Sequence, residues 1–296
     1  MKKHLDGRVA IVTGASRGLG RTHALQLASE GAFVVVNDLG ASETGSPAAE
    51  LVEQIKAAGG DAFASGADVT DFEQVKAMVG AACEKWGSVD ILVNNAGILR
   101  DKSFAKMELD DFRLVMDVHV MGAVNCTKAV WELMREQNYG RIVMTTSSSG
   151  LYGNFGQANY GAAKMALVGL MQTLAIEGER NNIKVNCMAP TAATAMTEGL
   201  LSEDELAWLE PAAVSAGLIA LVAETAPTRT ILLGGAGGFE QAYITMTQGI
   251  FVGVGEGASE AVISRLSEVG DRSGETIPTT GFEQLRHEIA KAKANH

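Results

Sequence analysis

A glycine-rich turn between a short apolar run and a helical pattern constrains the fold of this chain more than any other feature. The run, residues 8–13, is rich in Val and Ile, as expected for a strand buried on both faces of a parallel sheet. The turn Thr13–Gly20 follows, and a helical pattern continues from about Leu19 to Glu30. A strand that passes through such a turn directly into a helix is typical of the first unit of an α/β sheet.

The same alternation continues along the chain. Further strands are expected at 33–38, at a segment ending near Asp68 and Val69, and at 90–94, 140–146, 183–188 and 230–233. Helices are expected at about 48–58, 71–86, 110–137 and 158–179, and residues 190–225 are interpreted as loop and short helices. The sequence therefore predicts an α/β fold: a single Rossmann-type doubly wound parallel sheet of about seven strands, with helices on both faces.

Two regions are expected within the 296 residues. Residues 1–235 would form the dinucleotide-binding domain, in which the apolar loop 190–225 covers the substrate or simply packs in the core. The apolar side chains of that loop are Ala192, Ala193, Met196, Leu200, Leu201 and Trp208. Residues 236–296 are interpreted as a C-terminal extension, packed on the same domain or on a neighbouring subunit. A second small domain is the alternative.

The composition excludes several classes of protein. Hydrophobic residues make up 47% and charged residues 20%, which gives a large core and excludes disorder for most of the chain. With 24 Lys and Arg against 35 Asp and Glu, the chain is poorly suited to binding nucleic acid, whose phosphates require a basic surface. No apolar run reaches the roughly 20 residues of a membrane span, so no membrane insertion is expected. Three scattered cysteines and the lack of a signal-peptide pattern favour the cytoplasm.

The glycine-rich turn also predicts a binding site. Gly14, Gly18 and Gly20 follow a G-x3-G-x-G spacing that allows the backbone to approach a pyrophosphate at the helix N-terminus. Asp38 follows the second strand, 18 residues after Gly20, close to the roughly 20 expected for a carboxylate on an adenosine ribose. Asp38 favours NAD because a carboxylate repels a 2′-phosphate, whereas the cation of Arg17 favours NADP. We predict NAD.

Asp68 and Val69 extend this site by one strand. The Asp68 carboxylate is positioned to accept a hydrogen bond from an adenine amino group, with Val69 against the ring. The alternative roles are structural: Asp68 as a neighbour of a helix N-cap, and Asp38 as an ordinary loop residue.

A second set of residues carries acid–base chemistry. Tyr160 and Lys164 are four residues apart at the start of a predicted helix, so they share one face. A free phenol titrates near 10, and bringing its pKa to about 7 requires roughly 4 kcal/mol of phenolate stabilisation, which an ammonium group can provide. Ser147, Ser148 and Ser149 follow the fifth strand at the carboxyl edge, where a hydroxyl can donate to a developing oxyanion. Spacing alone does not choose among the three serines.

Together, the segments Thr13–Gly20 and Asn94–Gly97, Ser147, and the pair Tyr160 and Lys164 resemble the short-chain dehydrogenase/reductase superfamily, over about residues 6–235. The resemblance implies that Ser147, 13 residues before Tyr160, is the catalytic serine, and that Tyr160 is the general acid/base. It implies that Lys164 binds the nicotinamide ribose and lowers the Tyr160 pKa. The predicted cofactor-binding residues are Gly14, Ser16, Arg17, Gly18, Leu19, Gly20, Asp38, Asp68, Val69, Asn94, Ala96, Gly97, Tyr160, Lys164, Pro190 and Thr191.

One position departs from the family pattern. The family carries a catalytic Asn in a V-N-x-x-G motif, and this chain has His119 there, within residues 118–122. His119 either takes part in the proton relay or satisfies a buried helix carbonyl. We count it with the catalytic residues and predict no metal site.

A closer resemblance lies in residues 36–40, 94–100 (NNAGILR) and 149–160. These segments look like the (3R)-hydroxyacyl-CoA dehydrogenase domain of the peroxisomal multifunctional enzymes type 2, the 17β-hydroxysteroid dehydrogenases type 4. The resemblance implies NAD-dependent oxidation of a (3R)-3-hydroxyacyl-CoA, or of a hydroxysteroid or steroid side-chain CoA ester. The alternatives are an NADPH-dependent 3-oxoacyl reductase and a non-catalytic dinucleotide-binding regulatory protein.

The resemblance also implies assembly. Family members are usually dimers or tetramers, so a homo-dimer or homo-tetramer is expected, with a separate enoyl-CoA hydratase as a possible partner. The C-terminal residues 294–296 carry no peroxisomal SKL-type signal, which favours a freestanding bacterial-type dehydrogenase.

Overall fold

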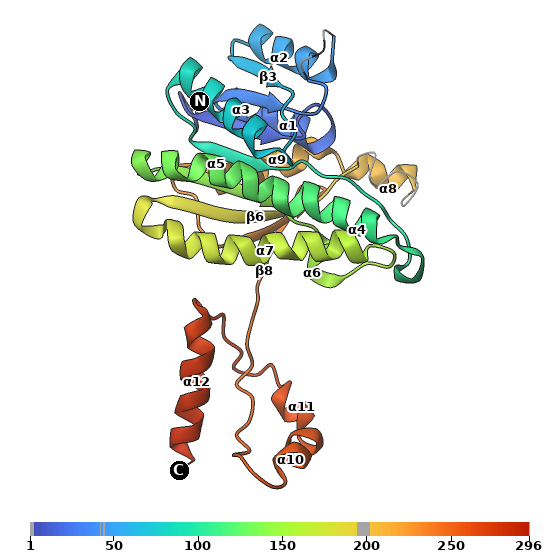
Figure 1. The fold of residues 1–296 in the computed structure, drawn as a ribbon, viewed down its shortest axis with the longest axis vertical. Coiled ribbons are helices and arrows are strands. Elements are labelled where there is room, and N and C mark those ends of the chain that lie inside the picture. The colour runs from blue at the N-terminus through green and yellow to red at the C-terminus, as the bar shows by residue number, and fades with distance from the viewer. Residues whose placement is uncertain (1–2, 42, 44, 194–201, 296) are drawn as a thin grey trace. The chain divides into compact units, whose positions relative to one another are not determined.

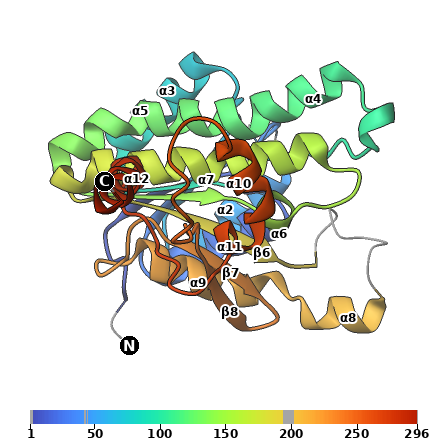
Figure 2. The same ribbon diagram turned by 90° about the horizontal axis from the view of Figure 1, so that it is seen from below.

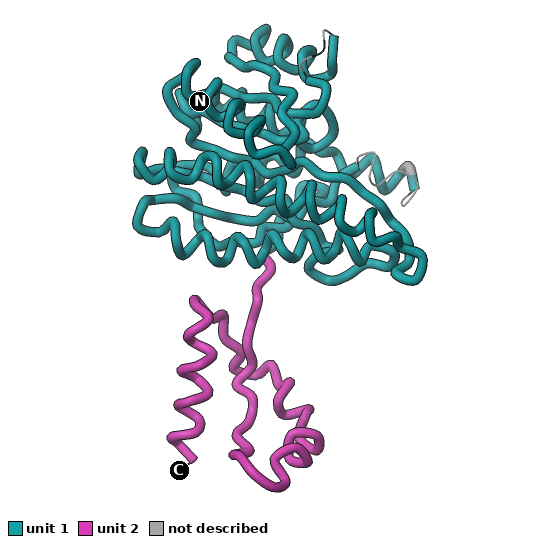
Figure 3. Tube along the Cα trace, viewed as in Figure 1, with its two compact units in different colours: residues 1–241 teal, residues 242–296 magenta. Residues whose placement is uncertain are grey.

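The computed structural model describes residues 3–295, except 42, 44 and 194–201. The chain divides into two compact units, Met1–Gln241 and Ala242–His296 (Figure 3). The boundary lies after the predicted one at 235 because a further strand extends the sheet past the glycine-rich segment.

The first unit contains one sheet of eight strands in the order β3-β2-β1-β4-β5-β6-β7-β8 (Figure 1). Strands β1 to β7 pair in parallel, and the order reverses between β1 and β4, so the predicted doubly wound sheet is confirmed. The strands are β1 (Val9–Thr13), β2 (Phe33–Asn37), β3 (Ala62–Ser65), β4 (Ile91–Asn94), β5 (Gly140–Thr145), β6 (Ile183–Thr191), β7 (Ile231–Gly235) and β8 (Gly238–Ala242).

Strand β8 corrects the prediction of about seven strands. It follows β7 through Ala236 and Gly237, whose φ angles are 51° and 79°. Positive φ at both central residues is the signature of a type I′ hairpin turn, which joins antiparallel strands. No strand was predicted here because the glycines around the turn mask the strand pattern. Two other bounds also differ: β3 ends at Ser65, before Asp68, and β6 continues to Thr191.

Helices cover both faces of the sheet (Figure 2). One layer contains α1 (Gly18–Ser29), α2 (Pro47–Ala57) and α9 (Pro211–Val222), and the other contains α3 (Phe72–Trp86), α4 (Leu109–Met116), α5 (Gly122–Gln137) and α7 (Ala158–Gly178). Local signals define their ends: the Ser46 hydroxyl caps α2 ahead of Pro47, and Asp71 caps α3, which ends at Gly87 in the left-handed conformation. The core of the first layer joins apolar side chains of β1 and β2 to α1, α2 and α9.

The single helix predicted over 110–137 is interrupted. A π-helical turn, η2 (Asp117–Met121), separates α4 from α5 and contains His119. Such turns insert an extra residue into a helix and are frequent at functional sites. The sequence does not reveal the turn, because residues 110–121 contain neither Gly nor Pro and are compatible with one continuous helix. Two short 3-10 helices, η1 (Phe104–Lys106) and η3 (Glu179–Asn181), and α6 (Ser148–Tyr152) complete this layer.

The region predicted as loop and short helices contains α8 (Glu203–Trp208) and the longer α9. Within the described residues, the stretch Asp204–Val222 is long and apolar enough to span a membrane by length and composition. It is two helices broken before Pro211, and Val214, Leu218 and Leu221 of α9 lie in the core. A buried core helix passes the same test of length and composition.

The second unit contains α10 (Ala258–Ser264), α11 (Leu266–Val269) and α12 (Gly281–Ala294). An isolated antiparallel bridge joins Met246 to Thr276. Among its described residues none is buried, and apolar side chains such as Ile263, Phe282 and Leu285 are more than half or about half exposed. Helix α12 therefore carries an apolar face together with a charged one.

Acid is expected to destabilise the first unit through His23. This side chain is fully buried between α1 and α9, and burial lowers its pKa from 6.5 to about 4. Between these two pH values His23 is protonated in the unfolded chain and neutral in the folded one. The free energy of unfolding therefore falls by about 3 kcal/mol as the pH falls from 6.5 to 4. Urea unfolding should show this loss in the wild type and a smaller one in His23→Gln. The exposed His4→Gln should behave as the wild type; equal slopes in all three proteins would contradict the prediction.

Candidate active site

The predicted site residues gather at the carboxyl ends of the central strands. Gly14 follows β1, Asn94 ends β4 and precedes Ala96 and Gly97, Ser147 follows β5, and Pro190 lies at the end of β6. Because the strands are parallel, these ends form one edge, and the reversal of strand order between β1 and β4 opens a crevice there.

The glycine-rich turn leaves no room for a side chain at Gly14 or Gly20. Gly14 and Gly18 have φ of 62° and 51°, and a Cβ on Gly20 would lie 2.1 Å from the Gly14 carbonyl oxygen. Asn95, which we did not predict, holds this turn: its side-chain amide donates to the carbonyls of Thr13 and Gly14. The only sequence signal for Asn95 is its place between two predicted residues.

Asp38 lies beside the same turn. Its Oδ2 accepts hydrogen bonds from the backbone N–H of Ser16 at 3.0 Å and from the Ser16 hydroxyl. Ser16 therefore orients the carboxylate and connects the two predicted parts of the cofactor site. Arg17 precedes α1 with an extended backbone and an exposed side chain. Leu19 lies in the first turn of α1.

Asp68 and Val69 follow β3. The Asp68 Oδ1 accepts from both the backbone N–H and the hydroxyl of Thr70, so its carboxylate also stabilises the turn before α3. The Val69 side chain packs against α5, where a Cβ on Gly122 would lie 2.7 Å from it. Val69 thus bridges the crevice and the helix that follows His119.

Tyr160 and Lys164 lie one turn apart at the start of α7, near Ser147. Ser147 caps α6 by accepting from the backbone N–H of Ser149 at 3.2 Å. Lys164 is 3% exposed, its ammonium donates to the Thr145 carbonyl at 2.6 Å, and it lies 5.4 Å from the centre of the Tyr160 ring. The pair therefore meets the end of β5, as the spacing predicts.

The chain's own groups raise the pKa of Tyr160 rather than lower it. The main cause is burial of the phenol; a hydrogen bond with Ser147 opposes the rise and the Asp101 carboxylate adds to it. Burial also lowers the pKa of Lys164 to about 7. A lysine that is only half charged near pH 7 stabilises the phenolate less than a fully charged lysine would. The expected lowering of the Tyr160 pKa thus requires a further positive charge at the site.

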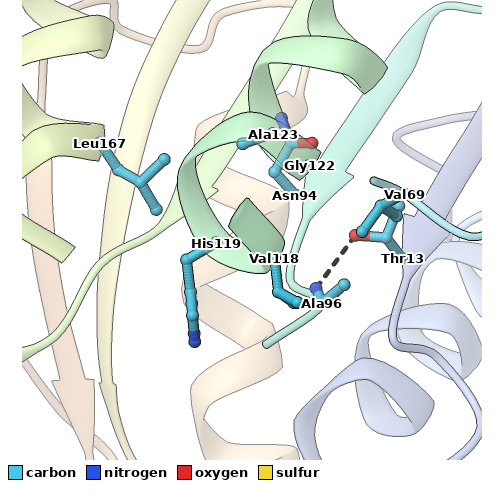
Figure 4. Close-up of a pocket in the computed structure, with 9 residues that line it drawn as sticks. All are labelled: Thr13, Val69, Asn94, Ala96, Val118, His119, Gly122, Ala123 and Leu167. Carbon is cyan, nitrogen blue, oxygen red and sulfur yellow. Dashed lines mark hydrogen bonds between the residues drawn. The ribbon is translucent and has the colours of Figure 1, made fainter. Parts of the chain in front are cut away.

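His119 is buried behind Tyr160. Its Nε2 contacts the backbone N–H and carbonyl of Ile98 at 3.0 and 2.8 Å, and its ring meets the Tyr160 ring edge-on at 5.3 Å. Burial, followed by the charge of Lys164, lowers its pKa to about 3, so the imidazole is neutral at pH 7. Its Nδ1 is buried and makes no hydrogen bond among the described residues. The ring lines a cavity of about 10 Å³, the size for one water molecule (Figure 4).

The remaining predicted residues lie at the rim. Pro190 and Thr191 pair with Gly234 and Gly235 of β7. Of the apolar loop, Ala192 is buried and Trp208 is 76% exposed. Met196, Leu200 and Leu201 lie outside the described residues. The described part of the chain holds no group of three metal-ligating side chains.

The His119 ring lies so close to Gly97 that Gly97→Ala is expected to disturb the site. A Cβ there would lie 2.2 Å from Cε1 of His119, so the ring must shift from its present edge-on position against Tyr160. Misplacement of this order is expected to lower kcat by about 10- to 100-fold, with a loss of about 1–3 kcal/mol of stability from overpacking. Gly80→Ala in α3 is the matched control because its Cβ would meet nothing within 4 Å. Full activity of Gly97→Ala would contradict the packing argument.

Comparison with known proteins agrees with this geometry. The family model described as short chain dehydrogenase matches residues 8–205. The chain belongs to the short-chain dehydrogenase family. In this family, the sequence is 53% identical over 207 residues to peroxisomal multifunctional enzyme type 2 of Drosophila melanogaster, covering 68% of this chain and 34% of the relative. The predicted resemblance to these enzymes is confirmed.

Two solved structures of short-chain dehydrogenases are similar to this one. Full-length Drosophila peroxisomal multifunctional enzyme type 2 has a TM-score of 0.81 at 37% identity, covering 97% of this chain and 49% of that one. A 7α-hydroxysteroid dehydrogenase complexed with NADH and 7-oxo glycochenodeoxycholic acid has a TM-score of 0.72 at 31% identity, covering 81% and 97%. The chain therefore spans about a third to a half of the multifunctional relatives.

Proposed function

We propose that this short-chain dehydrogenase oxidises a secondary alcohol to a ketone with NAD. The observation that carries the proposal is the meeting of Ser147, Tyr160 and the buried Lys164 at the carboxyl end of β5. A hydroxyl donor, a phenol and an ammonium at the crevice of an open α/β sheet suit proton removal from an alcohol.

In this proposal, the alcohol oxygen lies against the Tyr160 phenol and the Ser147 hydroxyl. The phenolate of Tyr160 takes the hydroxyl proton, while Ser147 donates a hydrogen bond to the substrate oxygen as alcohol and as ketone. A bound oxidised dinucleotide would supply the acceptor for the hydride of the carbinol carbon and a positive charge near the phenol. That positive charge would stabilise the phenolate and so lower the pKa of Tyr160, which Lys164 alone does not achieve.

The proton then leaves through Lys164 and His119. Lys164, with a pKa near 7, can exchange a proton at neutral pH. The neutral His119 acts as a hydrogen-bonding group for water next to the phenol and not as a cation. This is a narrower role than that of an acid or base, and it agrees with the relay proposed for the position.

The residues of the cofactor site suit a dinucleotide. Gly14 and Gly20 carry no side chain where the turn is too tight for one, Gly18 is exposed at the N-terminus of α1, and Ser16 occupies only one oxygen of Asp38. The other oxygen is available to the ribose hydroxyls, which supports NAD. The alternative, an NADPH-dependent 3-oxoacyl reductase, is favoured by the exposed cation of Arg17.

The proposed substrate is a (3R)-3-hydroxyacyl-CoA, with a hydroxysteroid or a steroid side-chain CoA ester as the second candidate. Similarity to multifunctional enzyme type 2 supports the first, and similarity to a 7α-hydroxysteroid dehydrogenase supports the second. NADH formation should be measured with (3R) and (3S) hydroxyacyl-CoA, each with NAD and NADP. We expect turnover of the (3R) isomer with NAD. If NAD binds but neither isomer is oxidised, a hydroxysteroid or a steroid side-chain CoA ester becomes the favoured substrate.

We further propose that the chain works in the cytoplasm as a homo-dimer or homo-tetramer, with a separate enoyl-CoA hydratase supplying its substrate. Light scattering of the purified chain tests the oligomer. Binding of NAD without turnover of any hydroxy substrate would favour the non-catalytic regulatory alternative.

A further inference from the structure

Helices α1 and α9 pack together (Figure 1). Between them lies a polar cluster that the proposed catalytic steps do not use. The cluster consists of His23 and Thr22 of α1 and Ser215 of α9. His23 and Ser215 are each 1% exposed. Polar side chains this deeply buried are retained only when hydrogen bonds compensate for lost solvent.

The hydrogen bonds of this cluster run in one direction. The Thr22 hydroxyl donates to the Leu19 carbonyl at 2.9 Å, and the Ser215 hydroxyl donates to Thr22 Oγ1 at 3.2 Å. Ser215 has then used its only hydrogen, so it accepts from His23 Nδ1, which lies 2.8 Å from its oxygen. The directions therefore assign His23 the Nδ1–H tautomer. Burial lowers the pKa of His23 to about 4, which keeps the ring neutral.

The chain of bonds ends at the cofactor turn. Leu19 lies between Gly18 and Gly20 in the first turn of α1, whose backbone N–H groups would face a pyrophosphate. The other end is anchored in α9, which is fixed in the core by apolar side chains. Ser215 thus ties the first turn of α1 to a helix that is fixed in the core.

We propose that Ser215 and Thr22 are positioning residues for the dinucleotide: they hold the Leu19 carbonyl, and with it the first turn of α1, in the orientation that binds the pyrophosphate. This inference rests on the dinucleotide binding proposed above. Without the two hydroxyls, the Leu19 carbonyl and the buried His23 ring lose their hydrogen-bond partners in α1 and α9, and the first turn of α1 is no longer tied to α9.

Equilibrium binding of NAD, measured by calorimetry, tests the proposal. Thr22→Val and Ser215→Ala should each raise the Kd by about 10-fold, and the double variant should raise it no further than the larger single effect, because both act through one chain of bonds. The effect should fall on Kd and KM for NAD more than on kcat. Thr22→Ser keeps the hydroxyl and should restore wild-type binding. This rescue separates positioning from a general loss of structure.

Ser29→Ala is the matched control. Ser29 also lies on α1 and donates to a carbonyl one turn back, that of Gln26, so its hydrogen bond stays within α1. Its Kd should stay within about twofold of the wild type, the scale of a surface substitution. Unchanged Kd in folded Thr22→Val and Ser215→Ala would overturn the inference.

Nitrogen-15 NMR gives a readout that needs neither cofactor nor substrate. His23 should show a protonated Nδ1 and an unprotonated Nε2 at neutral pH. A protonated Nε2 would overturn the assigned direction of the bonds. If the wild type binds neither NAD nor NADP, the proposed function fails together with the positioning role. If only the positioning role is wrong, the wild type and its variants bind NAD equally well, which distinguishes the two outcomes.

Discussion

Replacing Tyr160 with Phe lowers kcat by about 100- to 10,000-fold, the usual range for loss of a general acid or base. Phe keeps the ring that packs edge-on against His119 and removes only the hydroxyl that would take the substrate proton. Initial rates of NADH formation at saturating substrate measure the effect. Binding of NAD should be retained, because the glycine-rich turn and Asp38 are untouched.

Tyr152→Phe provides the control for Tyr160→Phe. Tyr152 lies in the neighbouring α6 and is 69% exposed, so loss of its hydroxyl should leave the rate within about twofold. A Tyr160→Phe protein with near-normal turnover would remove the phenol from the mechanism. The rate of the wild type should also rise with pH in the oxidation direction, because the raised pKa of Tyr160 keeps the phenol protonated at low pH.

Replacing Asp38 with Ala is expected to change the ratio of kcat/KM for NAD to that for NADP by about 100-fold in favour of NADP. Two effects add: the ribose hydroxyls lose a charged acceptor, worth about 1.5–3 kcal/mol, and a 2′-phosphate loses a repelling neighbour. Steady-state kinetics with both cofactors measure the ratio.

Two variants separate the roles around Asp38. Ser16→Ala removes the hydroxyl bond to the carboxylate but keeps the charge, so it should weaken NAD binding while preserving the preference. Arg17→Ala should lower the residual activity with NADP, since its exposed cation is the group that would meet a 2′-phosphate. A wild-type preference for NADP, or an unchanged ratio in Asp38→Ala, would favour the reductase alternative.

Much of the fold could be predicted from the sequence because local patterns are strong in a parallel α/β sheet. Buried strands are continuous Val- and Ile-rich runs, and β1, β2, β4 and β5 lie close to the predicted ranges. The strand β8 could not be predicted because its sequence, GFEQA, is short and polar, and only pairing with β7 makes it a strand. The π-helical turn at residues 117–121 was hidden because neither Gly nor Pro marks it in the sequence.

The candidate site divides in the same way. Tyr160 and Lys164 are neighbours on a helix, so their spacing brings them together without further information. Ser147 needed the family resemblance, since three adjacent serines look alike in the sequence. Asn95 was missed because its role is to hold the backbone of a turn about 80 residues earlier, which no local pattern encodes.

The sequence by itself determined the order of strands and helices, the glycine-rich turn and the residues that carry the chemistry, because each depends on neighbours within a few positions. Only the tertiary structure decided the protonation of those residues and the contacts that orient them. Burial among distant strands and helices keeps His119 neutral, lowers the pKa of Lys164 to about 7 and raises that of Tyr160. It also brings Ser215 to Thr22 across 193 positions of sequence. Desolvation and long-range hydrogen bonding depend on what surrounds a side chain in space, and local sequence does not contain that information.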